Sequence, residues 1–512
     1  MPQRHIDIIG GGPAGLYAAR LLKISRPDWS VTVHERMHGS GETFGFGVVL
    51  TGSTMDNLVR ADPASAADIR RVSHSGHALH LRRGTEQIDL HGARNLAIGR
   101  NTLLEVFAAH AREAGVVIES GSQAEASTLD GDVIIAADGV RSKTREKLAA
   151  ELGAEVSIGR GRYLWCGADF ALADSMFSPV RTEDGLFVAH AYPYAPNRST
   201  FLIETDDASW QAAGMDRNGT STVDGNSDEF SLRYLQHAFA DDLAGRPLLG
   251  NRSRWQRFHT VHLQRWSHDN TVLIGDAAHT AHYTLGSGTK LALEDAIALT
   301  DSLLTDDDPP TAFAHYEHQR RPAVTRFQRL AARSQRWWES FPQRIDQPLS
   351  TLAAGFMTRA GNIDLDRLAI NASDLLRNAL HRYSRTAGNE LPDDLVQWIL
   401  DQPWSNGTST LPTRVLDDAT TLPSITTSTW SQSDPFSADA DTIVNRARTA
   451  RAEVIRLQGA NHLTGIQGRI DLAERLRREV DTPVLIDVPA DARPEAAAAL
   501  LCGRCDLVHF TS

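Results

Sequence analysis

A glycine motif near the start of the chain, Gly10-Gly11-Gly12-Pro13-Ala14-Gly15, restricts the fold more than any other stretch. The apolar run His5 to Gly10 before it predicts a buried parallel strand, and the run Pro13 to Lys23 predicts a helix. A second predicted strand, Ser30 to Glu35, follows that helix. Together they form a βαβ unit, which indicates an α/β fold with a Rossmann-like parallel sheet.

Each part of this motif suits a dinucleotide. Gly10 permits the tight turn after the strand, Gly12 lets the backbone approach a pyrophosphate, and Gly15 lets the helix pack on the sheet. The pyrophosphate would lie at the helix start, and the Glu35 carboxylate would accept hydrogen bonds from ribose hydroxyls. The motif alone does not distinguish FAD from NAD(P). The expected contacts are Gly10, Gly12, Pro13, Ala14, Gly15, Glu35 and Arg36.

The bulk composition argues against several classes of partner. A net charge of −12 over 512 residues disfavours nucleic-acid binding, which needs a basic face. No run of about 18 apolar residues predicts a membrane span, and the first residues lack a signal-peptide layout. Three cysteines predict neither a disulfide framework nor a complete zinc site, so we expect a cytoplasmic protein without a metal. The sequence leaves a homodimer open.

The length and the changing pattern of apolar residues predict several segments. Buried strands alternate with helices in the first part, and apolar and polar residues alternate in the middle, as in an antiparallel sheet. The expected segments are an FAD-binding domain in two parts (1–160 and 266–340), an inserted antiparallel-sheet substrate domain (161–265), a helical region (341–405), a linker rich in Ser, Thr, Pro and Asp (406–437) and a small C-terminal βα piece (438–512).

A second motif identifies the dinucleotide as FAD. Gly275-Asp276-Ala277-Ala278-His279 follows the predicted strand Val272 to Ile274, and Gly286-Ser287-Gly288 opens the next predicted helix. An Asp at a strand end can accept a hydrogen bond from a ribityl hydroxyl. Backbone N–H groups at the helix start would favour negative charge on the reduced flavin ring. The expected flavin contacts here are Asp276, Gly286, Gly288, Thr289 and Lys290.

With these motifs the chain resembles the group A flavoprotein monooxygenases, the family of para-hydroxybenzoate hydroxylase. Further matches are Arg100-Asn101-Thr102-Leu103, Asp138-Gly139 and Tyr316-Glu317-His318-Gln319-Arg320-Arg321-Pro322. The resemblance implies that Arg100 contacts the FAD pyrophosphate and that Asp138 helps to handle FAD and NAD(P)H. It also implies an aromatic hydroxylase that uses NAD(P)H, O2 and a flavin C4a-hydroperoxide. Because no second dinucleotide motif is present, NAD(P)H is expected to bind transiently.

The residues after the Gly-Asp motif resemble a narrower branch, that of salicylyl-CoA 5-hydroxylase and 2-aminobenzoyl-CoA monooxygenase/reductase. His282-Tyr283 stands where the general family has a Pro pair, and Lys290 where it has Asn. Phe44-Gly45-Phe46-Gly47-Val48-Val49 matches the branch's loop beside the flavin. The resemblance implies that Val48 contacts the flavin and that His282, Tyr283 and His190 face the substrate. The alternative is that His282 and Tyr283 only fill space beside a helix start and that His190 faces solvent.

The C-terminal piece resembles the last few βα units of the old-yellow-enzyme barrel that many members of the branch carry. Leu472 to Val488 and Gly503 to Val508 carry that likeness. A complete barrel takes about 250 residues, and Asp487-Val488-Pro489 stands where a glycine-rich phosphate turn is expected. The piece is therefore expected to be a remnant without a second flavin.

The resemblance implies a substrate that is a hydroxy- or aminobenzoyl thioester of CoA or of a carrier protein. Two alternatives stay open: a hydroxylase of a free arene or indole in a tailoring pathway, and a flavin-fold binding protein without turnover. Arg82-Arg83 or Arg160 with Arg162 could bind CoA phosphates, although such residues more often form a solvated face. The aromatic cluster Trp337-Trp338-Phe341 is expected to belong to the core.

Overall fold

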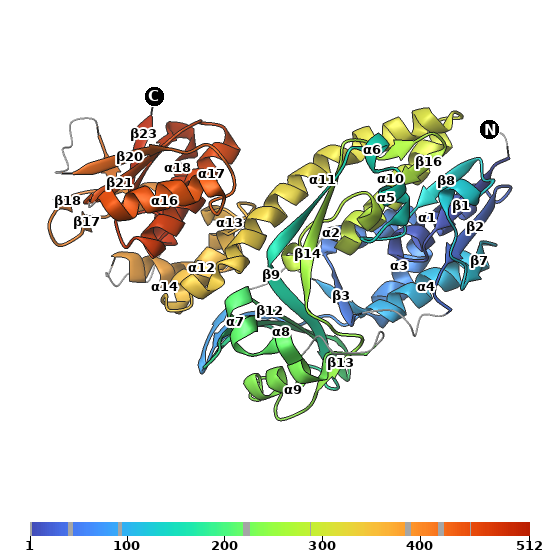
Figure 1. Cartoon of the computed structure of the whole chain (residues 1–512), viewed down its shortest axis with the longest axis horizontal. Coiled ribbons are helices and arrows are strands. Elements are labelled where there is room, and N and C mark those ends of the chain that lie inside the picture. Colours follow the sequence, from blue (N-terminus) through green and yellow to red (C-terminus); the bar gives the residue numbers. More distant parts are fainter. Residues whose placement is uncertain are drawn as a thin grey trace. The chain divides into compact units, whose positions relative to one another are not determined.

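The computed structural model describes residues 3–38, 45–90, 95–218, 226–286, 288–384, 391–417, 424–450 and 452–511. The chain divides into two compact units (Figure 1). The first comprises Met1–Gly84 and Gly92–Glu339, and the second comprises Thr85–His91 and Ser340–Ser512. Within the described ranges, no helix is both long and apolar enough to cross a membrane.

A largely parallel sheet forms the centre of the nucleotide-binding part of the first unit. Its strands are β1 (His5–Ile9), β2 (Ser30–Glu35), β7 (Val117–Ser120), β8 (Val133–Ala136), β15 (Ser267–His268) and β16 (Thr271–Leu273). Their order is β15-β16-β8-β1-β2-β7, and only β15 runs antiparallel to its neighbour. Strand β8 is continuously apolar and buried, and β1 is buried apart from the half-buried His5, as expected for the centre of a parallel sheet.

Long helices pack with this sheet into one hydrophobic core. They are α1 (Pro13–Ser25), α4 (Arg100–Glu113), α10 (Gly288–Thr305) and α11 (Pro309–Glu339), with the shorter α2 (Gly52–Ala61), α3 (Pro63–Val72), α5 (Lys143–Lys147) and α6 (Ala149–Leu152). Helix α1 contacts β1, β2, α4 and α10, and α10 contacts α11. The turn before α1 and the turn before α10 therefore lie on helices that are packed against each other.

The second sheet of the first unit is mainly antiparallel, as the alternating residues predict. Its strands within the first unit are β4 (Leu79–Arg83), β9 (Ala154–Ala168), β10 (Ser175–Thr182), β11 (Gly185–Ala195), β12 (Arg198–Thr205), β13 (Leu248–Gly250) and β14 (Gln256–Leu263). They follow the order β13-β9-β12-β11-β10-β4, and β14 also pairs with β9. Strand β4 pairs in parallel with β10, and the other pairings are antiparallel.

The two faces of this sheet differ. Phe187, Phe201 and Ile203 point to one face and share a core with residues of α7 (Asp207–Ala212) and α9 (Glu229–Ala238). Side chains alternate between the faces along a strand. His190 on β11 and Glu204 on β12 therefore lie on the opposite face, away from these helices.

The second unit contains a five-stranded parallel sheet in the order β19-β23-β22-β21-β20. The strands are β19 (Val415–Leu416), β20 (Ile425–Thr429), β21 (Val454–Gln458), β22 (Val484–Pro489) and β23 (Leu507–Thr511). The helices of this unit are α12 (Leu349–Thr358), α13 (Leu365–Asn371), α14 (Ser373–Ser384), α15 (Leu395–Leu400), α16 (Ala438–Ala450), α17 (Leu463–Glu479) and α18 (Arg493–Leu501).

The segment expected to be a linker, 406–437, is instead part of this unit. It supplies the edge strands β19 and β20 of the sheet, and β18 (Thr410–Leu411) pairs with β17 (Trp404–Ser405). The Ser- and Thr-rich composition reflects an edge strand, because most residues of β20 are exposed or half-buried. The helical region 341–405 and the βα piece 438–512 also belong to this one unit.

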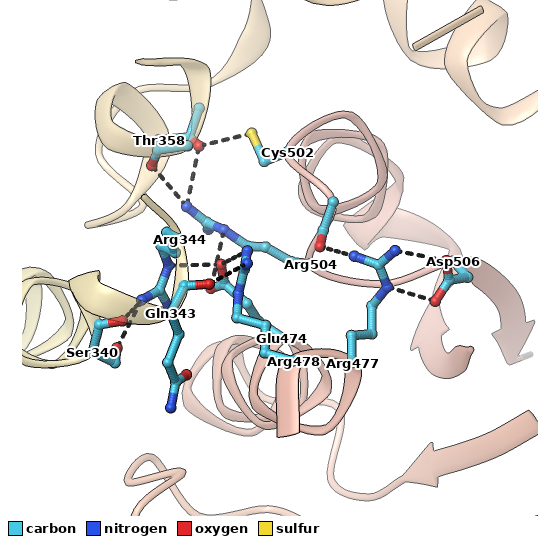
Figure 2. A network of polar contacts seen from close by, with 12 residues as sticks. Ser340, Gln343, Arg344, Thr358, Glu474, Arg477, Arg478, Cys502, Arg504 and Asp506 are labelled. Atoms are coloured by element: carbon cyan, nitrogen blue, oxygen red, sulfur yellow. Dashed lines mark hydrogen bonds and ion pairs between the residues drawn. The ribbon is translucent and has the colours of Figure 1, made fainter. Parts of the chain in front are cut away.

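A buried ion cluster joins the start of the second unit to α17 (Figure 2). Glu474 on α17 is 4% exposed and pairs with Arg344 at 2.8 Å, Arg478 at 2.9 Å and Arg504 at 3.8 Å. Burial raises the pKa of Glu474, but the three guanidinium groups outweigh it and hold the pKa well below its usual range. These guanidinium groups also donate to the backbone carbonyls of Ser340, Gln343 and Gly355.

Candidate functional site

The glycine motif has the geometry that a pyrophosphate needs. Gly10 has a φ of +105°, and a Cβ on it would lie 2.4 Å from the Ala137 carbonyl oxygen. A Cβ on Gly15 would lie 2.1 Å from the Gly10 carbonyl oxygen, so neither position tolerates a side chain. A Cβ on Gly12 would meet no atom within 4 Å, and the helix that starts there has no side-chain cap. The helix start therefore lies beside open space in which an anion fits.

Glu35 lies at the end of β2 beside the same turn. Its Oε2 accepts the Gly11 N–H at 2.6 Å, and its Oε1 accepts the Met37 N–H at 2.8 Å. The carboxylate is half-buried and each oxygen keeps a further lone pair, so it can still accept from a ribose hydroxyl. The neighbouring Arg36 is exposed. The structure adds a role in bracing the glycine turn that the sequence did not predict.

Asp138 and Asp276 follow the neighbouring strands β8 and β16. Asp138 Oδ2 accepts from the N–H and the hydroxyl of Thr144, each at 3.2 Å. Its buried Oδ1 has no hydrogen-bond partner within the described part of the chain. Arg145 donates to the carbonyl oxygens of Asp276 and Ala277, so its helix holds the two strand ends together. The unpartnered oxygen of Asp138 is an acceptor left for a ligand hydroxyl or amide.

The Asp276 side chain is exposed to solvent, and charged side chains of the protein lie around it. Its side chain is exposed, but burial raises the pKa of its carboxyl, and the Arg100 guanidinium opposes that rise. Burial also lowers the pKa of the half-buried Arg100, which lies at the start of α4 and is influenced by Asp276. A carboxylate and a cation placed in this way suit the hydroxyls and phosphates of one polar ligand.

A buried network holds the turn that carries Asp276. Asp295 on α10 is fully buried and accepts the Gly275 N–H at 3.0 Å. It lies 2.7 Å from His279 Nε2 and accepts from Arg320 Nε at 2.8 Å. Burial raises the pKa of Asp295, but His279 and Arg320 outweigh it, so the pKa lies below its usual range. The sequence motifs contain His279 and Arg320, but this positioning role and the part of Asp295 in it were not predicted from them.

The second glycine turn comes directly before α10. Gly286 has a φ of +64°, and a Cβ on it would meet no atom within 4 Å. Gly288, Thr289 and Lys290 form the first turn of α10 and are half-buried. Lys290 Nζ lies 2.5 Å from Glu294 Oε1, so its charge is paired within the helix.

A short ribbon of β3 (Gly47–Leu50) and β6 (Leu96–Gly99) leads into Arg100. Val48 is buried in β3. The neighbouring Gly47 accepts a hydrogen bond from Tyr192 OH at 2.7 Å and donates to Thr200 Oγ1 at 2.9 Å, which fixes the ribbon to the antiparallel sheet. Phe44 and Ser287, which belong to the predicted motifs, lie outside the described residues.

Three polar side chains meet on the face of the antiparallel sheet that lies away from its helices. Tyr283 OH donates to Glu204 Oε1 at 2.5 Å, and His190 Nε2 lies 3.5 Å from Glu204 Oε2. The side chains of His190 and Glu204 are 9% and 12% exposed. His190 and Tyr283 were predicted from the sequence as substrate-facing residues, whereas Glu204 was not predicted. A carboxylate directly after the apolar run Phe201 to Ile203 was the available signal.

His282 is buried beside this cluster. Its Nδ1 lies 3.0 Å from Thr284 Oγ1, which lies 2.8 Å from Ser334 Oγ on α11. Burial raises the pKa of Glu204, but His190, His282 and the Tyr283 hydroxyl outweigh it, so the pKa of Glu204 lies below its usual range. The structure thus brings the three predicted substrate-facing residues, His190, His282 and Tyr283, together around a carboxylate.

Aromatic rings pack around the cluster. The ring centroids of Trp338 and Phe177 lie 4.4 Å and 4.8 Å from that of His190. The ring of Tyr163 lies 5.0 Å from that of Tyr283. Trp338 is buried, as expected for a core residue, but its ring also packs directly against His190.

Tyr163 connects this cluster to the Gly-Asp motif. Burial raises the pKa of Tyr163 to about 12, and the charge of Asp276 contributes to the rise. Asp276 therefore lies close enough to act electrostatically on a ring that packs against Tyr283. The Gly-Asp motif thus lies close to the polar cluster.

Three of the four arginines considered for a CoA phosphate, Arg82, Arg160 and Arg162, are engaged in ion pairs. Arg162 also stacks on the Trp210 ring at 3.6 Å. An arginine already paired with a carboxylate has less charge to offer a phosphate, which favours a structural role for these residues. The pairs are Arg82–Asp242 at 3.0 Å, Arg160–Glu339 at 3.4 Å and Arg162–Asp207 at 2.5 Å.

Comparison with known proteins agrees with this geometry. A family model described as an FAD binding domain matches residues 117–331. Salicyloyl-CoA 5-hydroxylase from a Streptomyces species is 34% identical over 534 residues, covering 99% of this chain and 99% of that protein. The 3-hydroxy-4-methyl-anthranilyl-[aryl-carrier protein] 5-monooxygenase of Streptosporangium sibiricum is 39% identical over 369 residues, covering 72% of this chain and 98% of that protein.

Solved structures show the same fold. A crystal structure of 2-methyl-3-hydroxypyridine-5-carboxylic acid oxygenase matches with a TM-score of 0.54 at 19% identity, covering 73% of this chain and 97% of that chain. This likeness supports the parallel sheet with an added antiparallel sheet. The match to the Streptomyces protein extends over nearly the whole chain, so that relative shares the second unit as well.

Proposed function

The chain belongs to the FAD-dependent aromatic monooxygenases, and we propose that it hydroxylates a hydroxy- or aminobenzoyl group tethered to CoA or to a carrier protein. The observation that carries the proposal is that both relatives above, at 34% and 39% identity, have names that specify an acyl arene attached to such a tether. NAD(P)H is the reductant typical of this family. The alternative of a flavin-fold protein without turnover is not supported.

The residues of the first unit fit FAD. The open helix start at Gly12 suits the pyrophosphate, Glu35 suits the adenosine ribose, and Arg100, which is influenced by Asp276, offers a cation to a phosphate. Asp276 and the unpartnered Asp138 oxygen suit the hydroxyls and amides between pyrophosphate and ring. Bound FAD supplies the redox chemistry, in which NAD(P)H and O2 yield one oxygen atom for the ring and one for water. The protein's tasks are to position the arene and to exclude water.

Glu35→Ala is expected to weaken FAD binding by roughly tenfold, because the adenosine end loses an acceptor and the Gly11 N–H loses its partner. The position of hydroxylation should not change, since Glu35 lies at the far end of the dinucleotide. FAD titration and product analysis at full FAD loading test both parts. Glu119→Ala on the neighbouring strand β7 is the control. A changed product position in a fully loaded Glu35 variant would contradict the assignment.

His282→Ala is expected to keep FAD binding and NAD(P)H oxidation. Much of the NAD(P)H that it oxidises should yield H2O2 and not hydroxylated product. The buried imidazole fills the space beside Tyr283 and Thr284, and its loss would admit water to the reacting oxygen. Product and H2O2 formed per NAD(P)H measure the effect, which should be a several-fold loss of coupling. His262→Ala on the exposed side of β14 should couple as the parent does. If the His282 variant forms as much product per NAD(P)H as the parent protein, His282 only fills space.

We also expect one FAD per chain. The second unit carries Asp487-Val488-Pro489 at the end of β22, where a phosphate-binding barrel would need a glycine-rich turn. The ratio of flavin absorbance to protein concentration in the purified, FAD-saturated protein measures this. A ratio near two would show that the second unit binds flavin.

A substrate screen tests the proposed substrate class. The FAD-loaded protein is given 2-hydroxybenzoyl-CoA, 2-aminobenzoyl-CoA, the free acids and indole, and the rate of NAD(P)H oxidation is followed. Stimulation by the CoA thioesters above the free compounds supports a tethered substrate. Stimulation by a free arene or indole alone would move the assignment to an untethered substrate.

A further inference from the structure

Resting on the proposed function, we propose that Tyr283 and Glu204 form an acceptor-only recognition pair, which selects neutral arenes with an O–H or N–H on the ring and rejects ethers and anions. Nothing in the sequence motifs assigns Glu204. The pair would be a specificity determinant within the substrate site.

Tyr283 has a single hydroxyl hydrogen, and Glu204 already accepts it. A tyrosine hydroxyl has one hydrogen to donate and lone pairs to accept. In the structure that hydrogen is donated to Glu204 Oε1 at 2.5 Å. Burial and the Glu204 charge raise the pKa of Tyr283 well above its usual value, so it stays a phenol and does not act as a base. A ligand that reaches the half-buried Tyr283 oxygen therefore meets only an acceptor.

Glu204 carries a negative charge in the cluster. Its pKa lies below the usual range, because the neighbouring imidazoles and the Tyr283 hydroxyl outweigh the effect of burial. Glu204 thus remains a carboxylate. It has no proton of its own to donate to the Tyr283 oxygen, so the Tyr283 hydrogen stays in the hydrogen bond to Glu204 and is not free to be donated to a ligand. A carboxylate that is only 12% exposed also acts at short range on any charge beside it, because little water screens it.

These two properties define what the site accepts. A ring hydroxyl or amino group can donate to Tyr283 and is favoured, whereas a methoxy group of similar size offers no hydrogen and leaves two acceptors facing each other. A free benzoate brings a negative charge next to Glu204, whose carboxylate already serves as the partner of the His190 and His282 imidazoles. An acyl group bound through a thioester carries no such charge, which agrees with a tethered substrate.

The experiment measures dissociation constants by the change in flavin absorbance of the FAD-loaded protein. The probes are 2-hydroxybenzoyl, 2-aminobenzoyl and 2-methoxybenzoyl groups, each as the CoA thioester and as the methyl ester, together with 2-hydroxybenzoate. We expect the wild-type protein to bind the hydroxy and amino probes at least tenfold more tightly than the methoxy probe. It should also bind the methyl ester at least tenfold more tightly than the free acid.

Glu204→Gln provides the decisive variant. The neutral amide can donate or accept, so Tyr283 becomes free to donate, and the methoxy probe and the free acid should each gain affinity. The hydroxy-to-methoxy ratio should fall to about one. Tyr283→Phe removes the acceptor and should lower the same ratio by weakening the hydroxy probe instead. A damaged fold does not produce a gain in affinity, so the two variants separate recognition from instability.

A matched control exists elsewhere on the same sheet domain. Tyr234 OH donates to Asp184 Oδ2 at 2.7 Å, which is the same kind of pair outside the site. Tyr234→Phe and Asp184→Asn should keep the wild-type ratios. A Glu204→Gln protein with the wild-type ratio, or a wild-type protein that binds methoxy as tightly as hydroxy probes, would overturn the inference. If the protein binds the methyl esters with the expected hydroxy-to-methoxy ratio but does not bind the CoA esters, the recognition pair stands and only the proposal of a tethered substrate is wrong.

Discussion

Glu474→Ala is expected to lower the free energy of unfolding of the second unit by about 3–5 kcal/mol, because it removes the carboxylate that Arg344, Arg478 and Arg504 share. Three guanidinium groups would then repel one another in an interior where burial already disfavours each charge. Figure 2 shows how the three side chains converge on this one carboxylate. The loss should be largest for the contact between the segment before α12 and helix α17.

Hydrogen exchange on peptides from α17 and β22 measures this loss within the second unit. The slowest amides should exchange roughly 10²- to 10³-fold faster, since about 1.4 kcal/mol corresponds to a factor of ten. Glu479→Ala on the same helix is the control. Its half-buried carboxylate pairs with Arg475 and Arg448, and its loss should cost at most about 1 kcal/mol. Equal effects of the two variants would show that the buried cluster contributes no more than a surface pair.

The pH dependence of this cluster follows from the direction of its pKa. A carboxyl whose pKa is depressed in the folded state contributes stability above its unfolded pKa and loses it as the pH falls through the folded pKa. Because the three guanidinium groups hold the pKa of Glu474 well below its usual range, this contribution should persist in mildly acidic solution. The difference between wild type and Glu474→Ala should therefore be nearly the same at pH 5 and at pH 7.

Asp276→Ala is expected to weaken FAD binding by about 10- to 150-fold, which corresponds to about 1.5–3 kcal/mol for a hydrogen bond to a charged group. The apo protein should not lose stability. Burial raises the pKa of Asp276, and a group with a raised pKa contributes stability that is lost as the pH rises through it. At neutral pH the carboxylate therefore opposes folding only slightly, because solvent screens the exposed side chain, and its removal should leave the melting temperature of the apo protein unchanged or higher.

Two measurements separate this prediction from a structural role. Isothermal titration gives the FAD affinity, and a thermal scan of the apo protein gives its stability. Asp276→Asn keeps an acceptor oxygen and should lose less affinity than the alanine variant. Full FAD occupancy with unchanged affinity in Asp276→Ala, or a destabilised apo protein, would contradict the assignment of Asp276 to the cofactor.

The sequence could predict those parts of the site that lie within one local motif. Gly10 was expected to permit a tight turn and Gly15 to allow close packing of the helix, and a Cβ on either would clash with a backbone oxygen at 2.4 Å or 2.1 Å. The strand, turn and helix around them are set by residues close in sequence. The branch resemblance likewise predicted that Tyr283 and His282 face the substrate, and the structure has both beside Glu204.

Parts that depend on long-range pairing could not be predicted. Glu204 became a candidate only when the register of β11 and β12 put it on the same face as His190. The partners of Arg82, Arg160 and Arg162 lie far away in sequence, so composition alone could not tell an ion pair from a free basic face. The segment 406–437 was misjudged because polar edge strands and linkers share a composition.

The central claim is that the chain uses FAD and O2 to hydroxylate a tethered benzoyl group. The most direct measurement is mass spectrometry of the acyl group after one turnover of the FAD-loaded protein with NAD(P)H, 2-hydroxybenzoyl- or 2-aminobenzoyl-CoA and ¹⁸O2. The account predicts one ¹⁸O atom on the ring of the thioester and little or none on the free acids. Labelled product from the free acids or from indole, with none from the thioesters, would contradict it.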